Sequence, residues 1–251
     1  MLTMTIWCVG TLLECLVLVR GFRQALYRQF PIFYAYLLFV IINEFVRLAV
    51  YRWDSAHYFR VYWATQFLSL ALGCGIIFEI YRVALRSFPG AARMTRYVLL
   101  IVFGAIFAKA LILASEDVSS LAATSLILER NLRIVQALAA LTLVSLFMWY
   151  AIPFGKNLKG ILLGYALFIG MSILQITFLY YTWDRIRPLW TYAPSVAYLV
   201  VLGIWVRTLW SAQAVPAASN VRLESDYEML LATTRSQFRR TLARLGWAAR
   251  A

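Results

Sequence analysis

Long apolar runs alternate with short polar segments along this chain of 251 residues. Seven of the runs are about twenty residues or more in length, which is what an α-helix needs to cross the hydrocarbon core of a bilayer. They cover residues 2–19, 31–51, 62–81, 97–114, 126–152, 160–181 and 190–210. The pattern predicts an all-α, polytopic membrane protein in which residues 1–210 form a bundle of seven transmembrane helices.

The residues beyond the last apolar run follow a different pattern. Residues 211–220 are small or polar and include a proline, which predicts a linker. In residues 221–251 apolar side chains recur at helical spacing, flanked by the arginines Arg235, Arg239, Arg240 and Arg244. We expect a basic amphipathic helix that lies on anionic lipids of the inner leaflet. Docking to a cytoplasmic or membrane protein partner is the alternative use of such a helix.

The distribution of basic residues predicts the orientation of the bundle. With the N-terminus outside, 16 of the 24 Lys and Arg residues fall on the inner side and 6 fall in outer loops. The first apolar run has no basic residue before it, whereas Arg20, Arg23 and Arg28 follow it. Because cytoplasmic loops carry the excess of Lys and Arg, we expect the N-terminus outside and the C-terminus in the cytoplasm. A bacterial inner membrane is the expected location.

Composition narrows the class of protein further. Hydrophobic residues make up 63% of the chain and charged residues 14%, which excludes a soluble enzyme and a nucleic-acid-binding domain. We therefore assign the net charge of +13 to contact with the inner membrane surface and not to nucleic acid. Three cysteines without a CxxC pair and a single histidine, His57, provide no metal, haem or nucleophile–base site. We expect no cofactor, no metal and no catalytic residues.

Polar side chains inside the apolar runs are the candidates for function, because charged groups are costly there and usually face the bundle interior. Seven of them are predicted to lie in the outer half of the bundle: Asn43, Glu44, Arg47, Lys109, Glu129, Arg133 and Gln136. A pocket with three cationic side chains suits an anionic or zwitterionic ligand. The alternative is structural, since Glu44 can pair with Arg47, and Glu129 with Arg133, on their own helices.

Charged residues without a partner on their own helix need a partner elsewhere in the bundle. Glu14 and Lys109 are of this kind, and Glu79 lies at a similar depth to Arg207, so we predict an ion pair between the last two. Gly160 and Gly164 form a GxxxG motif, which fits either a homodimer or close packing of helices within one chain.

Three classes of function are compatible with these features. The first, which we favour, is a non-catalytic receptor-like or accessory protein that binds a small molecule, a lipid or a membrane partner within the bundle. The second is a small transporter, because residues 51–54 and 181–184 share the pattern Tyr-x-Trp-Asp, as in a repeat of three helices on either side of a fourth. The third is an intramembrane enzyme acting on lipid, with Glu14, Glu44 or Glu79 as acid or base. A lone carboxylate is poor equipment for that chemistry.

Overall fold

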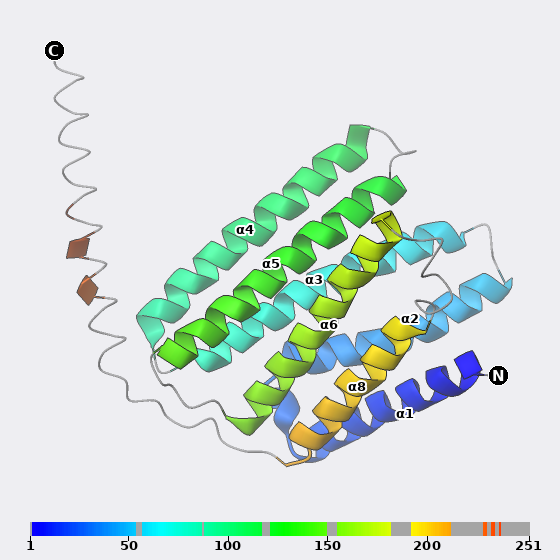
Figure 1. Cartoon of the computed structure of the whole chain (residues 1–251), viewed down its shortest axis with the longest axis horizontal. Coiled ribbons are helices and arrows are strands. Elements are labelled where there is room, and N and C mark those ends of the chain that lie inside the picture. The colour runs from blue at the N-terminus through cyan, green and yellow to red at the C-terminus, as the bar shows by residue number, and fades with distance from the viewer. Residues whose placement is uncertain are drawn as a thin grey trace.

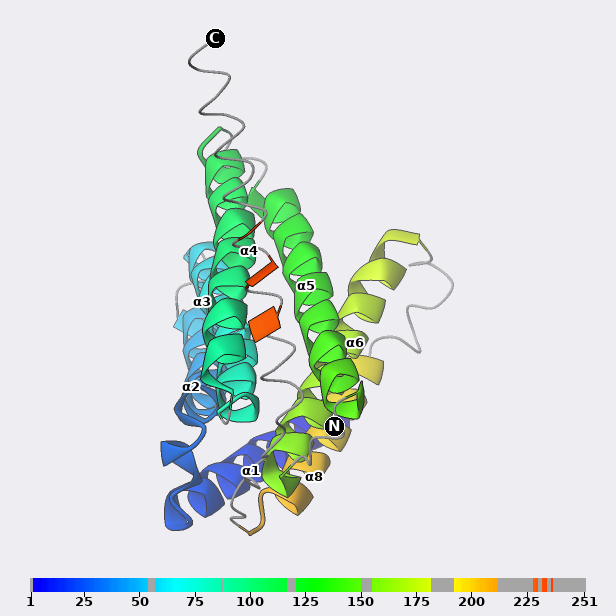
Figure 2. The same cartoon turned by 90° about the vertical axis from the view of Figure 1, so that its left-hand side faces the viewer.

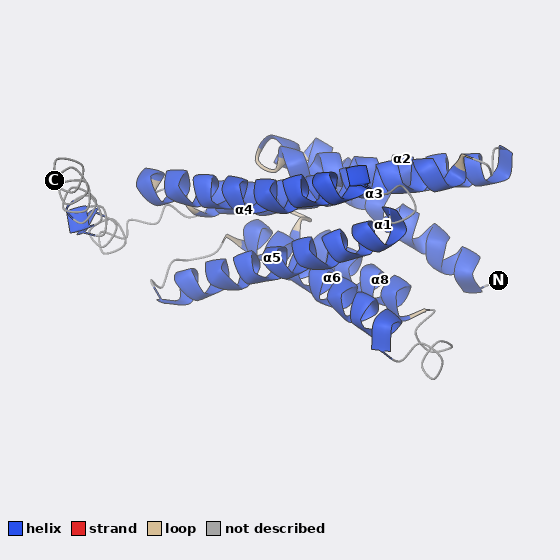
Figure 3. Ribbon diagram, turned by 90° about the horizontal axis from the view of Figure 1, so that it is seen from above, coloured by secondary structure: helices blue, strands red, loops and turns tan. Residues whose placement is uncertain are grey.

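The computed structural model describes residues 2–53, 57–86, 88–116, 121–149, 155–181 and 192–211, together with tail residues 228, 229, 232, 233 and 236. Within these residues the chain is helical and contains no strand (Figure 3). The predicted all-α class is therefore confirmed. Arg235, Arg239, Arg240 and Arg244 of the predicted tail helix lie outside the described residues.

The described residues form seven α-helices and one short 3-10 turn. They are α1 (Leu2–Arg23), η1 (Leu26–Arg28), α2 (Pro31–Trp53), α3 (Tyr58–Ala84), α4 (Pro89–Glu116), α5 (Leu121–Trp149), α6 (Lys156–Tyr181) and α8 (Ala193–Thr208). Five of them, α1, α2, α3, α4 and α6, are long and apolar enough to cross a membrane, and α8 is a shorter apolar helix. The fold is thus compatible with integration into a membrane.

Two layers of helices make up the bundle. One layer contains α2, α3 and α4, and the other contains α5, α6 and α8, with α4 at one edge (Figures 1 and 3). Between the layers α3 packs against α5 and α6, while α4 packs against α5. At the edge opposite α4, α1 contacts both α2 and α8 and so connects the two layers (Figure 2). The bundle core therefore surrounds α3.

The burial of side chains follows this arrangement. Leu70, Ile76 and Ile77 of α3 are almost completely buried, as expected for the helix with neighbours on both sides. On α4, by contrast, Ile101 is 70% exposed and Tyr97 is 60% exposed. An apolar helix with so few buried side chains is expected to face lipid in a membrane.

Two prolines set the starts of α2 and α4. Pro31 begins α2 where the apolar run also begins, and Pro89 begins α4 eight residues before the apolar run that starts at residue 97. Proline is favoured in the first turn because its missing N–H has no partner there in any case. The apolar run marks the part of α4 suited to the hydrocarbon core, whereas the helix itself continues through polar residues that include Arg93 and Arg96.

Candidate functional site

A cavity of about 220 Å³ lies where α1, α2 and α8 meet, near the N-terminal end of α1. In the described residues the α2 and α8 backbones do not touch directly, because α1 lies against both. Towards the other end of these helices large side chains fill the gap. There the Phe33 and Trp205 rings meet edge to face, with their centroids 4.9 Å apart. At the end near the N-terminus the gap is left open as the cavity.

We call this cavity the α1/α2/α8 pocket. Its lining residues are Ile6, Trp7, Gly10, Glu44, Tyr192, Ser195, Tyr198 and Leu199. They combine one carboxylate with a serine hydroxyl, three aromatic rings and aliphatic side chains. Helical spacing explains the set, because Ile6, Trp7 and Gly10 share one face of α1, as Ser195, Tyr198 and Leu199 share one face of α8.

Hydrogen bonds hold the carboxylates at this junction. The Thr11 hydroxyl lies 3.2 Å from Oε2 of Glu44 and 3.1 Å from the carbonyl oxygen of Trp7, so its one hydrogen is shared between them. The Tyr198 hydroxyl donates to Oε1 of Glu14 at 2.5 Å. Glu14 is fully buried, and its Oε2 has no hydrogen-bond partner among the described residues. The carboxylate of Glu44 on α2 therefore lines the pocket itself, and that of Glu14 on α1 is bonded to the lining residue Tyr198.

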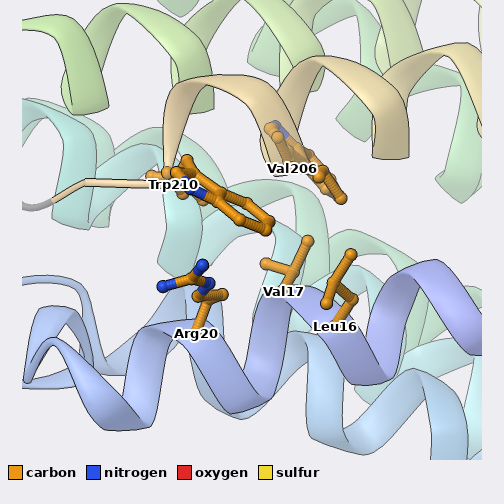
Figure 4. A pocket seen from close by; sticks show the side chains of 7 residues that line it. Leu16, Val17, Arg20, Val206 and Trp210 are labelled. Atoms are coloured by element: carbon orange, nitrogen blue, oxygen red, sulfur yellow. The ribbon is translucent and has the colours of Figure 1, made fainter.

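A separate set of contacts joins α1 to α8 at their C-terminal ends. The Arg20 guanidinium lies 3.7 Å from the centroid of the Trp210 ring, and Gln24 Nε2 donates to the Trp210 carbonyl oxygen at 2.5 Å. Figure 4 shows Arg20 facing Trp210, with Leu16 and Val17 beside Val206. Side chains leave almost no space in this narrow cleft. The seam between α1 and α8 is therefore closed at one end and open at the pocket.

The arginine of α2 belongs to a different polar network, on the α3 side of that helix. Arg47 donates through Nη2 and Nε to the Thr65 hydroxyl at 2.9 and 3.0 Å, and through Nη2 to Gln66 Oε1 at 3.3 Å. Its guanidinium also lies 4.4 Å from the centroid of the Tyr62 ring. Gln66 then donates to Oε2 of Glu129 at 3.0 Å, which connects α3 to α5.

The network continues into the core between α5 and α6. Glu129 Oε1 lies 3.6 Å from Nη2 of Arg133, which confirms the predicted pair. Arg133 is 4% exposed and donates to Gln136 Oε1 at 3.4 Å, while the Gln136 amide contacts the Cys74 sulfur at 3.4 Å. The Tyr165 hydroxyl lies 3.5 Å from the same Gln136 oxygen. This closely packed set is suited to fixing the positions of α3, α5 and α6.

The structure therefore divides the predicted pocket into separate parts. Glu44 lies in the α1/α2/α8 pocket, whereas Arg47, Glu129, Arg133 and Gln136 belong to the network around α3. Asn43 is half-buried, and its Oδ1 has no hydrogen-bond partner among the described residues. Lys109 is exposed on α4, a helix that contacts α3 and α5 but neither α1 nor α2. The three cations predicted to share one pocket are not brought together.

Glu44 and Arg47 do not form the predicted pair, because Glu44 turns to Thr11 of α1 and Arg47 turns to α3. Glu79, for its part, lies beside the N-terminus of α2, where its oxygens accept the backbone N–H groups of Ile32 and Phe33, each at 2.8 Å. Its partner in an ion pair is Arg82 at 3.5 Å.

The structure thus places Glu79 beside Arg82 and not beside Arg207, whose side chain is exposed. The first turn of a helix has N–H groups without intrahelical partners, and a carboxylate is a favoured acceptor for them. Glu79 of α3 therefore caps α2 from a neighbouring helix, a role that an argument from depth alone does not reveal.

The GxxxG motif packs α6 against α8 within the chain. A Cβ atom on Gly160 would lie 2.0 Å from Thr208 Oγ1, and one on Gly164 would lie 2.3 Å from Trp205 Nε1. Both distances are far shorter than a real contact, so only glycine permits this approach. With both glycines covered by α8, the motif gives no support to a homodimer.

The sequence did not single out several residues that line the pocket, nor Thr11, which hydrogen-bonds to Glu44 in its wall. Trp7, Tyr192 and Tyr198 belong to an aromatic-rich chain in which such side chains usually mark the membrane interface. Thr11 and Ser195 are small hydroxyl residues of a kind common inside transmembrane helices. Their spacing could have indicated the pocket, because residues 195, 198 and 199 lie on one face of α8 and two of them carry a hydroxyl group.

The pocket can bind a ligand through a carboxylate, hydroxyl groups and aromatic faces. The described residues contain no group of three or more His, Cys, Asp and Glu side chains placed to hold a metal ion. The Arg133 network also offers buried donors, among them Arg133 Nε, which has no hydrogen-bond partner in the described part of the chain. No family model, no curated protein and no solved structure matches the chain, so the interpretation of this site rests on its geometry alone.

Proposed function

We propose that the protein is a non-catalytic integral membrane protein that binds a small molecule in the α1/α2/α8 pocket. The observation that carries this proposal is the 220 Å³ cavity with the Glu44 carboxylate in its wall. Ligand pockets are concave and mostly apolar, with a few polar groups that fix the orientation of the ligand. The pocket has this character, and its lining residues supply a carboxylate, hydroxyl groups and aromatic rings as binding groups.

The orientation that we propose is a seven-span bundle with the N-terminus outside and the C-terminus in the cytoplasm. The excess of basic residues on the inner side supports it. In this orientation the pocket lies nearer the outer side, and the Arg20–Trp210 contact lies near the inner side. A bacterial inner membrane remains the proposed location. Labelling of single cysteines placed before α1 and after α8, from each side of sealed vesicles, tests this orientation.

The tail is proposed to act as a membrane-surface helix. Arg235, Arg239, Arg240 and Arg244 would bind anionic lipid headgroups, and about 1 kcal/mol per basic residue is typical of such contacts. A protein partner bound by the same helix is the alternative. Protease protection of the tail, compared between nanodiscs with and without anionic lipid, tests the binding of the tail to lipid. Flotation of the whole protein does not test it.

Mass spectrometry of the protein released gently from its own membrane tests for a bound ligand. Gly10 lines the pocket, and a Cβ there would make an ordinary 3.7 Å contact with Leu199, so Gly10→Leu adds a side chain at the wall of the cavity from a Cβ that the backbone position tolerates. Gly104→Leu is the matched control, because Gly104 on α4 has open space around it.

We expect a reproducible extra mass on the wild type and on Gly104→Leu that is lost in Gly10→Leu. The same extra mass on both variants would place the ligand elsewhere. A protein that carries nothing except exchangeable lipid, in wild type and variants alike, would contradict a ligand-binding function.

A small transporter is the second candidate, and one observation favours it. The pocket takes α1 and α2 from the first three helices and α8 from the last three, so it lies between the two halves of the proposed repeat. Transporters built from repeats commonly place their substrate site at such an interface. Flux into proteoliposomes separates the two functions, and Glu44→Gln is expected to abolish any flux that depends on the pocket.

A further inference from the structure

The α1/α2/α8 pocket is lined by an acidic side chain and, among its lining residues, by no Lys, Arg or His. Glu44 is the one ionisable acid or base among its lining residues other than the tyrosines. Behind the Tyr198 ring, Glu14 adds a second carboxylate, and one of its oxygens has no hydrogen-bond partner in the described part of the chain. A cation in the pocket would therefore have a carboxylate in the wall and another close behind it.

Basic side chains of the described residues are directed elsewhere. The ion pairs among them join Arg82 to Glu79 and Arg133 to Glu129, and neither pair involves Glu14 or Glu44. Arg47 lies three residues after Glu44 on α2, yet its hydrogen bonds go to α3. Within the described residues, the two carboxylates at the pocket are thus left without a cationic partner inside the chain.

Aromatic rings line the pocket together with Glu44. Trp7 is held edge to face against Phe45 with the centroids 6.0 Å apart, and Tyr198 lies 6.0 Å from Phe168. The negative face of an aromatic ring attracts ammonium groups, most strongly when they are removed from water. The carbon atoms attached to an ammonium nitrogen can also pack against such rings.

The size and the lining residues favour an organic cation over a metal ion. A cavity of 220 Å³ is smaller than the range of about 300–1,000 Å³ typical of drug-sized ligands. Hard metal cations need about six oxygen ligands. The pocket offers one lining carboxylate, one serine hydroxyl and tyrosine hydroxyls among largely apolar atoms.

We propose that the ligand of the α1/α2/α8 pocket is a small organic cation, with its ammonium group held by Glu44 and its carbon atoms held against Trp7 and Leu199. This rests on the proposed function and differs from the anionic or zwitterionic ligand that the sequence suggests. That expectation placed Arg47, Lys109 and Arg133 in one pocket, and these three cations do not meet at one cavity.

Binding of defined probes to the protein in nanodiscs of uncharged lipid tests the proposal. The probes are methylammonium, tetramethylammonium and choline, together with 3,3-dimethylbutanol, which has the shape of choline without its charge, and butyrate as an anion. Isothermal titration gives an affinity for each. We expect at least one cation to bind at least tenfold more tightly than the neutral alcohol and butyrate.

Two pairs of variants connect that preference to the pocket. Glu44→Gln removes the charge but keeps an oxygen for the Thr11 hydroxyl, and Glu228→Gln removes one negative charge at an exposed residue of the tail. Trp7→Leu removes an aromatic wall, and Trp149→Leu removes an indole that is 82% exposed. We expect cation affinity to fall about tenfold or more in Glu44→Gln and Trp7→Leu, and to be unchanged in both controls. The Trp7 pair keeps the test valid if Glu44→Gln does not fold.

The assignment to cations would be overturned if none of the three cations bound more tightly than the neutral alcohol, or if butyrate bound more tightly than all of them. Unchanged cation affinity in the folded pocket variants would also overturn it. These failures differ from failure of the proposed function: a neutral or anionic mass displaced by Gly10→Leu leaves a pocket with another class of ligand, whereas the absence of any mass removes the pocket as a binding site.

Discussion

The hydroxyl of Tyr198 on α8 donates to the buried carboxylate of Glu14 on α1, joining two residues 184 positions apart in the chain. Around this hydrogen bond, α1 connects the two layers of the bundle and forms one wall of the pocket. Towards the other end of the two helices, Arg20 and Gln24 contact Trp210. The interface between α1 and α8 therefore has one polar contact at Glu14 and Tyr198 and another at Arg20 and Trp210, with apolar side chains between them.

Tyr198→Phe is expected to destabilise the fold. The substitution leaves Glu14 without its one described hydrogen bond, and an unsatisfied buried polar group costs about 1–3 kcal/mol. Tyr97→Phe is the control, because Tyr97 on α4 is 60% exposed. Unfolding in mixed micelles of increasing SDS content measures the difference. Equal stability of the two variants would show that the Glu14–Tyr198 bond contributes nothing.

Loss of the Glu79 cap is expected to destabilise the start of α2. Glu79→Ala removes the acceptor of two backbone N–H groups, at about 1–3 kcal/mol for each donor left unsatisfied. Glu79→Gln retains one side-chain oxygen, so we expect an intermediate loss. Arg82→Ala should have little effect, because the Arg82 side chain is 61% exposed. An effect of Arg82→Ala as large as that of Glu79→Ala would assign the stabilisation to the ion pair instead.

Substitutions of Glu129 and Arg133, the buried ion pair of α5, are expected to change the free energy of unfolding non-additively. Glu129→Gln leaves Arg133 buried without its counter-charge, and breaking such a pair by removing one partner typically costs about 3–5 kcal/mol. The double variant with Arg133→Met removes both charges and should recover much of that loss. A double-mutant cycle on the free energy of unfolding gives the coupling. Strict additivity would mean that the two side chains act independently.

Substitution of Gly164 is expected to separate α6 from α8. The new Cβ of Gly164→Ala meets the Trp205 ring, and overpacking of this kind costs about 1–3 kcal/mol. Gly104→Ala adds a methyl group in open space and should stabilise α4 by up to about 1 kcal/mol. Size-exclusion chromatography of both variants in detergent adds a second readout. A change of oligomeric state specific to Gly164→Ala, without loss of stability, would assign the motif to an interface between copies.

Ala25→Gly is expected to stabilise the turn between α1 and η1. Ala25 has φ 54° and ψ 21°, the left-handed conformation, which costs a residue with a Cβ about 1–2 kcal/mol and glycine much less. Part of that gain is offset by the greater freedom of glycine in the unfolded chain. Ala25→Val should lower the stability, since a branched side chain is strained in that conformation. The order Gly, Ala, Val in midpoints of unfolding is the expected result.

The helices were predictable from the sequence because their signals are local. An apolar run of about twenty residues is long enough for a span wherever it lies, and Pro31 marks the start of α2 directly. The helix α4 begins at Pro89, eight residues before its apolar run begins at residue 97. Hydrophobicity marks the part of a helix suited to lipid, and the helix ends are set by other residues.

The site was only partly predictable because it depends on which helices are neighbours. Glu44 and Arg47 lie on adjoining faces of α2, and α1 and α3 both pack against that helix. Long side chains from adjoining faces can turn either to each other or to different neighbours, and the structure shows the second arrangement. The Glu129–Arg133 pair was predictable because a spacing of four residues fixes it within one helix.

The capping of α2 by Glu79 makes the start of one helix depend on a later part of the chain. Glu79 is synthesised 47 residues after Ile32, so α2 leaves the ribosome before the acceptor for its first N–H groups exists. Until α3 has been synthesised, water is the available partner for those N–H groups. The start of α2 is therefore completed only when α3 packs against it, so the two helices depend on each other in the folded protein.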